Sequence, residues 1–376
     1  MIYLDNAATS LRKPFSLYPS MFYNTVFNSA NSGRGGHFYS IRASELIYRT
    51  TESLCTLFNI KSPEQIAYTH NATLALNMGI YGVLDKNSHA IITQMEHNSV
   101  LRPVHKICRY TVIKADSLGR INPKDIENAI CDDTKMIICP HASNVSGTIM
   151  PIDKIAKIAH RHNLYFMLDA AQSAGSIPID VEKTGIDIMA FSGHKGLMMP
   201  MGTGGIYVRE GINLNPLLTG GTGSLSESPT QPDFMPDVLQ SGTLNAPAII
   251  SAKKSIDFIL SETVDAIHKK ESYLASRVIN DLKNIDNVTV HSPQIYRNGT
   301  VAFNIKNKDS VTVSDILNKD FGICTRGGWH CAYPAHIALG TQKTGAVRAS
   351  FGYFNTEKHA KMLIDAIYKI ISKKIV

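Results

Sequence analysis

Two apolar runs, each leading to a charged residue, stand out in the hydrophobic pattern of the chain. The first covers 164–168 and ends at Asp169, and the second covers 188–191 and leads through Ser-Gly-His to Lys195. Short apolar runs of this kind predict buried strands. Because the carboxyl ends of parallel strands meet at one edge of an α/β sheet, we expect Asp169 and Lys195 to face one ligand. A capping carboxylate and a solvated lysine are the alternative interpretation of this pair.

Strand-like and helix-like patterns alternate along most of the chain, which predicts right-handed crossovers and a mostly parallel sheet. We expect further strands at 66–69, 90–93, 136–139, 204–208, 288–290 and 301–305. We expect helices at 40–58, 74–82, 153–162, 246–282, 310–319 and 357–373. The segment 219–242 is rich in Gly, Ser, Pro and Thr and lacks a period, so we expect a loop or lid there.

A chain of 376 residues is too long for one ordinary core. We therefore expect an α/β fold in which a large domain, residues 15–250, carries the mostly parallel sheet. Residues 1–14 and 251–376 are expected to form a smaller α+β domain.

Charge and cysteine content narrow the function classes. The formal net charge is +7, but Lys and Arg are scattered, which favours a mildly basic enzyme that attracts anions over a nucleic-acid binder. The six cysteines show no CxxC or metal-type spacing, so we expect no metal site. No signal-peptide pattern and no apolar run of membrane-spanning length occurs, and we expect a soluble, cytoplasmic protein without a membrane partner.

Eight short motifs in one order give the chain a family resemblance. It resembles the class V, fold-type I enzymes that depend on pyridoxal 5'-phosphate (PLP), and within them the cysteine desulfurases and selenocysteine lyases. The resemblance covers nearly the whole chain and implies a large PLP-binding domain. Its motifs lie at 3–8, 95–97, 143–147, 168–172, 191–195, 242–243, 330–332 and 347–350.

The resemblance implies a set of cofactor-binding residues. Lys195 would be the Schiff-base lysine, Asp169 the partner of the pyridine nitrogen, and His97 the residue that stacks on the ring. A carboxylate beside a pyridinium favours its protonated, electron-withdrawing form. The other implied cofactor residues are Gln172 at the ring hydroxyl, Ala72, Thr73, Ser192 and His194 at the phosphate, and Thr243 at the phosphate of a neighbouring subunit. A homodimer with shared sites is therefore implied.

Three further residues are assigned to the substrate by the same resemblance. Arg348 would bind an amino-acid carboxylate with its planar fork, with Asn144 as a second contact and Arg326 at the rim.

Cys331 is the residue that distinguishes desulfuration from the other reactions catalysed by the enzymes that the chain resembles. With Lys195 and His97 it would complete the catalytic set, because desulfuration of L-cysteine needs a thiolate that accepts sulfur as a persulfide and releases alanine. We expect the positive groups of Arg326 and His330 to favour that thiolate.

Several alternatives stay open at this point. The short connection from Cys331 to Arg348 resembles the Suf-type branch, in which a second histidine usually stands where this chain has Trp329. The alternatives are a selenocysteine lyase acting on L-selenocysteine, or an epimerase, β-lyase or aminotransferase in which Cys331 is incidental. A non-enzymatic protein on the same fold is a third class. A sulfur-acceptor protein is the expected partner.

Overall fold

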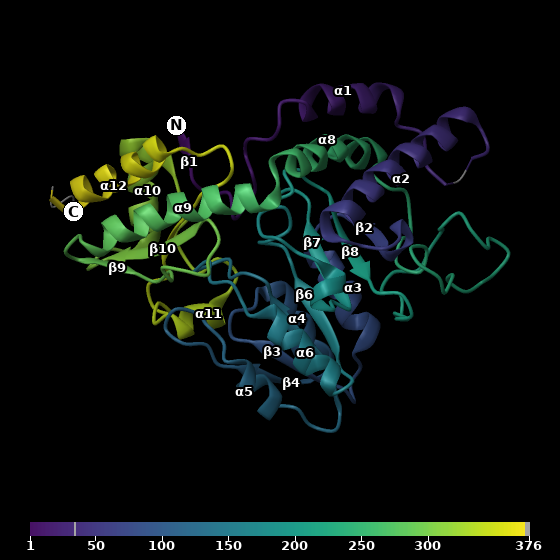
Figure 1. Cartoon of the computed structure of the whole chain (residues 1–376), viewed down its shortest axis with the longest axis horizontal. Helices are drawn as coiled ribbons and strands as arrows, with labels where there is room; N and C mark the ends of the chain where they lie inside the picture. The colour runs from purple at the N-terminus through teal and green to yellow at the C-terminus, as the bar shows by residue number, and fades with distance from the viewer. Residues whose placement is uncertain (34, 373–376) are drawn as a thin grey trace.

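A seven-stranded sheet forms the centre of the larger half of the molecule (Figure 1). The structure is a computed structural model, and it describes residues 1–33 and 35–372. In sheet order the strands are β2 (Ile66–Thr69), β8 (Gly204–Val208), β7 (Ile188–Ser192), β6 (Tyr165–Asp169), β5 (Thr134–Pro140), β3 (His89–Thr93) and β4 (Arg109–Ile113). Strand β8 is antiparallel to both of its neighbours, whereas the other neighbouring strands are parallel. The predicted mostly parallel sheet is confirmed.

Helices cover both faces of this sheet, which explains why its central strands are apolar without alternation. Ile91 and Ile137 point into one core, and Ile92 and Ile138 into the other. The first core includes side chains from α2 (Phe38–Phe58), α6 (Ile152–Arg161) and α8 (Ala246–Glu262). The second includes side chains from α3 (Ala72–Val83) and α4 (Asn98–Ile107). Shorter helices, α5 (Pro123–Asn128) and α7 (Val181–Thr184), and the outer α1 (Leu17–Phe27) complete this half.

The smaller half combines two small sheets with helices, as expected for an α+β unit. Strands β12 (Val347–Ser350), β10 (Thr300–Ile305) and β9 (Val288–Val290) form an antiparallel sheet. Strand β1 (Ile2–Tyr3) pairs in parallel with β11 (Ile323–Cys324), so the N-terminus lies beside the C-terminal third of the chain (Figure 1). The helices are α9 (Val264–Lys283), α10 (Ser310–Phe321), α11 (Tyr333–Ala338) and α12 (Glu357–Ser372).

The predicted helix at 246–282 is wrong in one respect. It is two helices, α8 and α9, which meet at Thr263, where φ is +65°. The Thr263 hydroxyl accepts a hydrogen bond from the Ala266 amide and thereby caps α9. The predicted domain boundary at residue 250 falls inside α8, whose Ile256 and Ile259 pack in a core of the larger half. The division into domains stays a prediction.

The other predicted elements agree with the structure within a few residues. The elements that were not predicted are β4, β11, β12, α4, α5, α7 and α11. The segment 219–242 contains no helix or strand, as expected, and its action as a lid stays a prediction. Residue 373, the predicted end of the last helix, lies outside the described residues. Among the described residues, no helix is both long and apolar enough to cross a membrane.

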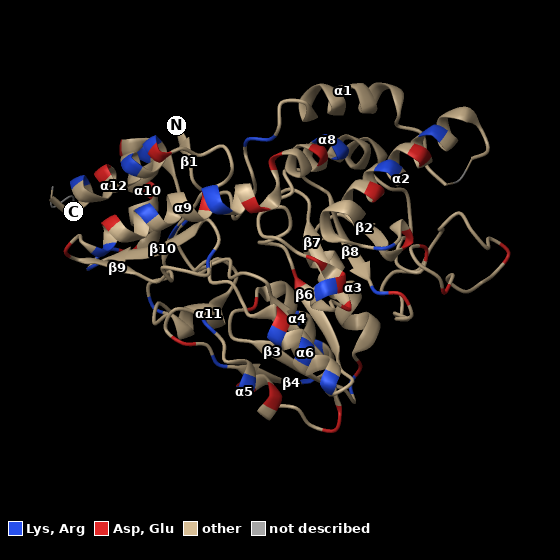
Figure 2. Cartoon of the chain, in the orientation of Figure 1, with Lys and Arg blue, Asp and Glu red and all other residues tan. Residues whose placement is uncertain are grey.

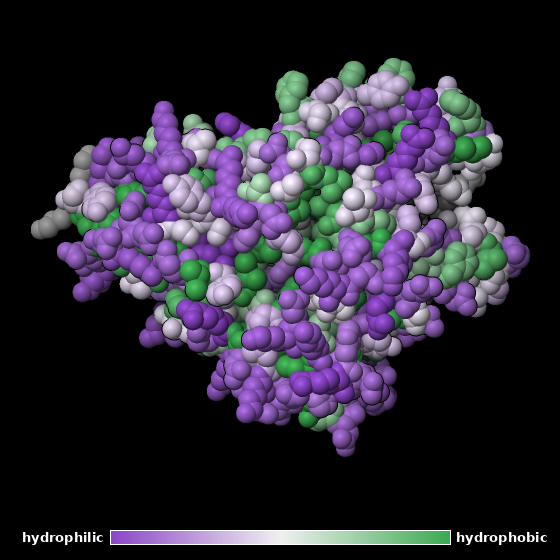
Figure 3. Space-filling view, viewed as in Figure 1, coloured by the Kyte–Doolittle hydropathy of each residue, from purple (hydrophilic) through white to green (hydrophobic). Residues whose placement is uncertain are grey.

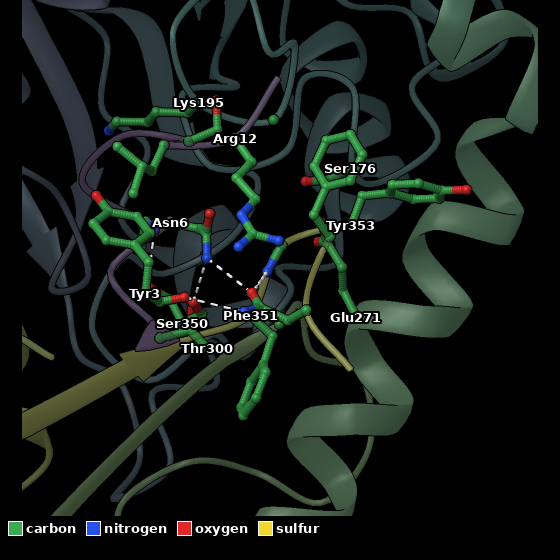
Figure 4. Close-up of a pocket in the computed structure, with 18 of the residues that line it drawn as sticks. Tyr3, Asn6, Arg12, Ser176, Lys195, Glu271, Thr300, Ser350, Phe351 and Tyr353 are labelled. Atoms are coloured by element: carbon green, nitrogen blue, oxygen red, sulfur yellow. Dashed lines mark hydrogen bonds between the residues drawn. The ribbon is translucent and has the colours of Figure 1, made fainter. Parts of the chain in front are cut away.

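A pocket that is open to solvent lies where the N-terminal segment, α9 and the residues after β12 meet (Figure 4). Arg12 extends into it, and Glu271 lines it from α9 (Figure 4). Glu271 is 8% exposed, and burial raises the pKa of its carboxyl to about 8. The folded protein therefore holds a proton on Glu271 that the unfolded chain releases near the ordinary value of 4.5.

Glu271 should make the stability of the protein fall as the pH rises from about 4.5 to about 8. In that interval the folded state binds more protons than the unfolded state, and each unit of pKa shift corresponds to about 1.4 kcal/mol. We expect Glu271→Gln to remove this dependence, measured as the free energy of urea unfolding at pH 6 and at pH 8. Glu45→Gln, at an exposed glutamate, is the control. Equal pH slopes in wild type and Glu271→Gln would contradict the assignment.

Candidate active site

The polar residues that follow the central strands converge on one pocket of about 440 Å³. Most of them lie at the carboxyl ends of β3, β5, β6 and β7, which share one edge of the sheet, and the rest begin α3. The pocket collects seven of the predicted site residues: Ala72, Thr73, His97, Asn144, Asp169, Gln172 and Lys195. The topology of the sheet therefore brings together residues that are up to 123 positions apart, from Ala72 to Lys195.

Lys195 follows β7 and lines this pocket. Burial lowers the pKa of its ammonium group to about 8, against the opposing effect of the Asp169 carboxylate. A substantial fraction of the amine is therefore neutral near pH 8, as a nucleophile or proton acceptor requires.

Asp169 ends β6 and is 5% exposed. Burial raises the pKa of its carboxyl, against the opposing effects of a hydrogen bond from the Ala171 amide, at 2.9 Å, and of the charge of Lys195. A cationic group placed against this carboxyl would favour the carboxylate. The protonated pyridine nitrogen of PLP is such a group, so the environment of Asp169 fits that cofactor.

His97 presents a neutral imidazole to the pocket. Burial, followed by the charge of Lys195, lowers its pKa to about 4. Its Nδ1 accepts a hydrogen bond from the Ser99 amide, at 3.1 Å, so the ring proton lies on Nε2. The Ser99 hydroxyl lies 2.9 Å from Nδ1 of His97 and 2.8 Å from the Thr73 hydroxyl. This chain of contacts fixes the plane of the ring.

The predicted phosphate-binding residues form a partial cradle. The Asn71 side chain caps α3 by accepting from the Leu74 amide, at 2.9 Å, and the first amides of a helix have no partner within the helix. Ser192 Oγ and His194 Nδ1 are buried without a hydrogen-bond partner among the described residues, although neither residue lines the pocket. Buried polar atoms without partners fit a site that receives a polar group.

Gln172 lies between the pocket and the N-terminal segment. Its Nε2 donates one hydrogen bond to the carbonyl of Ala7, at 3.0 Å. An amide nitrogen carries two hydrogens, so one donor remains for the ring hydroxyl.

Arg348 is almost completely buried, at 1% exposure, where three parts of the chain meet. Its Nη2 donates to the carboxylate of Asp5 at 2.6 Å, and its Nη1 donates to the carbonyl of Asn144 at 3.0 Å. Its Nε is buried without a partner among the described residues. The Nε edge of the guanidinium is therefore the part that can donate hydrogen bonds to a ligand carboxylate.

Cys331 lies on a loop of the smaller half and is exposed. Its carbonyl accepts from the Asn98 amide at 2.8 Å, and the carbonyl of His330 accepts from Nδ2 of Asn144 at 2.7 Å. Cys331 does not line the pocket of Lys195, but its loop is bonded to Asn144, which does. Arg326 is exposed, and its charge acts on both Lys195 and His97.

The expectation that His330 supplies a positive charge is wrong. Its ring is 3% exposed and packs inside the smaller half, where burial lowers its pKa well below the ordinary value. His330 is therefore a neutral imidazole, and Arg326 is the cation of the predicted pair.

Thr243 does not reach this pocket within one chain. It is exposed and lines a separate depression with His70 and Gln240. This placement is compatible with the predicted role at a neighbouring subunit.

Several residues that shape the site were not predicted. Asp5 lay inside the first motif but received no role, and Ser99 was given none although it follows His97 by two positions. The buried carboxyl of Glu96 accepts from the amide and the hydroxyl of Thr93, at 3.2 and 2.7 Å, and so fixes the turn that leads to His97.

The comparisons with known proteins agree with this geometry. The family model described as aminotransferase class V matches residues 2–363. The chain belongs to the class V aminotransferases. Probable cysteine desulfurases from Methanothermobacter thermautotrophicus and Halalkalibacterium halodurans are 32% and 34% identical to it. These matches cover 98% and 99% of this chain and 94% and 93% of the relatives.

A solved structure gives the same result. The apo structure of a cysteine desulfurase from Thermococcus onnurineus matches with a TM-score of 0.91 at 30% identity, over 99% of this chain and 95% of the other. The class V aminotransferases and cysteine desulfurases that match are PLP-dependent, so PLP is the cofactor of this protein. The resemblance to the Suf-type branch stays a prediction.

Asp5 should stabilise the fold through its ion pair with Arg348. Asp5→Ala leaves a buried guanidinium without its counter-charge, which costs about 3–5 kcal/mol for a fully buried pair and less here because the Asp5 side chain is 20% exposed. We expect a loss of about 1–3 kcal/mol in the free energy of unfolding, measured with urea. Asp315→Ala, which breaks an exposed pair with Lys319, should change it by less than about 1 kcal/mol. Equal losses in the two variants would refute the role of Asp5.

Proposed function

We propose that this protein is a PLP-dependent cysteine desulfurase, which converts L-cysteine to L-alanine and collects the sulfur as a persulfide on Cys331. The observation that carries the proposal is the exposed Cys331 thiol, on a loop bonded to Asn98 and Asn144 beside the pocket of Lys195. The names of the relatives support the same reaction.

We assign the cofactor to the pocket residues in the roles that the family resemblance implies. Lys195 Nζ would bind it covalently, Asp169 would be the partner of its ring nitrogen and His97 would stack on its ring. Ala72, Thr73, Ser192 and His194 would hold its phosphate, and Gln172 would donate to its ring hydroxyl. When bound, PLP supplies an electron sink for bonds broken next to the substrate amine.

The substrate is oriented by Arg348 and Asn144. The free Nε edge of Arg348 faces the α-carboxylate, while Asp5 and the Asn144 carbonyl hold the rest of the guanidinium in place. Arg326 adds a second positive group at the rim. Amino acids with a carboxylate are thereby favoured over neutral thiols.

Sulfur transfer then requires a nucleophile and a proton carrier. Cys331 Sγ attacks the substrate sulfur, so that an S–S bond forms while the C–S bond of the substrate breaks. The carbon that loses sulfur receives a proton and leaves as the methyl group of alanine. Lys195, whose pKa is lowered to about 8, is the group suited to carry protons within the pocket.

The persulfide must pass to an acceptor, and we propose a sulfur-acceptor protein in the cytoplasm. Trp329 and Tyr333 are 48% and 50% exposed on either side of Cys331, so an approaching protein meets apolar surface next to the thiol. All six cysteines are free, as in reducing compartments. Acidic and basic residues are interspersed along helices such as α9 and α12 (Figure 2), unlike the basic face of a nucleic-acid binder.

We further propose a homodimer that forms through α1 and the first half of α2. Hydrophobic atoms lie along the edge of the molecule formed by α1 (Figure 3). The exposed large apolar side chains of this α1–α2 face are 47% to 85% exposed: Phe15, Tyr18, Phe22, Tyr23, Val26, Phe27, Phe38, Tyr39, Ile41 and Tyr48. A face of this size in a monomer marks an interaction surface. A second copy is the occupant that would also let Thr243 act at a neighbouring phosphate.

Cys331→Ser should retain the cofactor but lose sulfur transfer. We expect an unchanged visible absorption band of bound PLP and a loss of alanine formation from L-cysteine of more than about 100-fold, equivalent to about 2.7 kcal/mol of barrier. Cys324→Ser, at a half-buried cysteine on β11, is the matched control. Full alanine formation by Cys331→Ser would overturn the assignment. Turnover of L-selenocysteine but not L-cysteine, in wild type and variant alike, would instead identify a selenocysteine lyase.

Phe22→Glu should separate the proposed dimer. Phe22 is 73% exposed in one chain, and a charge on a buried apolar interface is costly. We expect a monomer by light scattering and at least about a tenfold loss of alanine formation, because each site then lacks Thr243 of its neighbour. Tyr368→Glu on α12, at 49% exposure, is the control and should stay dimeric. A dimeric, fully active Phe22→Glu would exclude this face.

A further inference from the structure

The loop that carries Cys331 has an unfavourable backbone conformation. His330 and Cys331 have φ values of +51° and +57°, in the left-handed region that non-glycine residues rarely adopt. This conformation is unfavourable for a residue with a side chain, so it persists only where the surroundings impose it. Two bonds to Asn98 and Asn144 hold the loop from the larger half.

A chain of buried side chains holds the loop from the other side. Nε2 of His330 lies 3.1 Å from the carbonyl of Arg326, and its Nδ1 lies 3.4 Å from Nε2 of His336. Nδ1 of His336 lies 2.7 Å from the hydroxyl of Thr341. His330, His336 and Thr341 are 3%, 0% and 3% exposed.

The positions of the ring protons in this chain of hydrogen bonds follow from the backbone carbonyl at one end of it. The Arg326 carbonyl only accepts, so Nε2 of His330 carries the proton and its Nδ1 accepts from His336. His336 then accepts from the Thr341 hydroxyl through its remaining nitrogen. His336 thus supports the residue that precedes Cys331.

We propose that His336 and Thr341 are positioning residues, which impose the strained conformation of the 329–331 loop and thereby present the Cys331 thiol to the pocket. The Thr341 hydroxyl donates to Nδ1 of His336 and holds the ring in the position from which Nε2 donates to His330. Neither residue lines the pocket of Lys195, so both act through the loop. The role rests on the proposed desulfurase function but is tested separately from it.

Thr341→Val tests this role because it removes only the hydroxyl. The buried Nδ1 of His336 then loses its hydrogen-bond donor, so the ring is no longer held in the position from which Nε2 donates to His330. We expect about a tenfold slower formation of the Cys331 persulfide, followed by mass spectrometry, with an unchanged PLP absorption band. Thr341→Ser keeps the hydroxyl and should stay within about twofold of wild type.

Reaction of Cys331 with iodoacetamide gives a measurement that needs neither substrate nor turnover. We expect its rate to change at least about threefold in Thr341→Val and not in Thr341→Ser, with the exposed Cys131 as an internal reference. Unchanged alkylation and persulfide rates in a folded Thr341→Val would overturn the proposal. A wild type that forms no alanine while the alkylation rates still differ would reject the desulfurase and retain the positioning role.

His336→Gln provides a second test of the proposal, which is available if Thr341→Val fails to fold. The side-chain amide of the introduced glutamine supplies a hydrogen-bond donor near the position of Nε2 of His336. This donor does not depend on Thr341. We expect His336→Gln to keep persulfide formation within about threefold of wild type and to be insensitive to a further Thr341→Val change. A full additional loss in the double variant would show that Thr341 acts independently of His336, against the proposal.

Discussion

The burial of the Arg348 guanidinium is the constraint on which the geometry of the site depends. A charge at 1% exposure needs partners, and here they come from two distant segments, the Asp5 carboxylate and the carbonyl of Asn144. These two partners tie the N-terminal segment and the larger half to β12. Asn144 continues the connection, because its side chain donates to the carbonyl of His330. The position of the Cys331 loop therefore follows from how Arg348 is buried.

The charges around the pocket are arranged so that positive groups face the ligand while the imidazoles stay neutral. Burial lowers the pKa of both His97 and His194 to about 4, so neither ring adds a charge near neutral pH. Lys195, Arg326 and Arg348 remain as the cationic groups, and Asp169 is the carboxyl beneath them. The carboxylate of an amino-acid substrate would be attracted by this arrangement. The flat neutral ring of His97 is left free to stack, which a charged imidazolium beside Lys195 would oppose.

The sequence pattern predicted the sheet and the shared pocket of Asp169 and Lys195 because both depend on local signals. The other residues of that pocket were predicted from the family resemblance. Strands buried on both faces are continuous apolar runs, and the polar residues at their ends stay next to them in the chain. Other features depend on contacts that no local pattern carries. The pair of Asp5 and Arg348 spans 343 positions. The amphipathic pattern runs through Thr263 without a signal for the break. His330 was assigned a charge from its proximity to Cys331 in sequence, but the left-handed backbone turns its ring into the core of the smaller half.

That backbone conformation also explains how one loop serves two purposes. With positive φ at two consecutive residues, His330 points inward to His336 while Cys331 remains exposed. A thiol that accepts sulfur from a bound substrate must approach the pocket, and one that delivers sulfur must be reachable from outside. A mobile loop would meet both needs but would rarely hold the thiol in place for attack. A strained loop fixed by Asn98, Asn144 and His336 would meet both needs in one conformation. In the proposed mechanism the cofactor chemistry then belongs to the larger half, and the sulfur chemistry to the loop bonded to it.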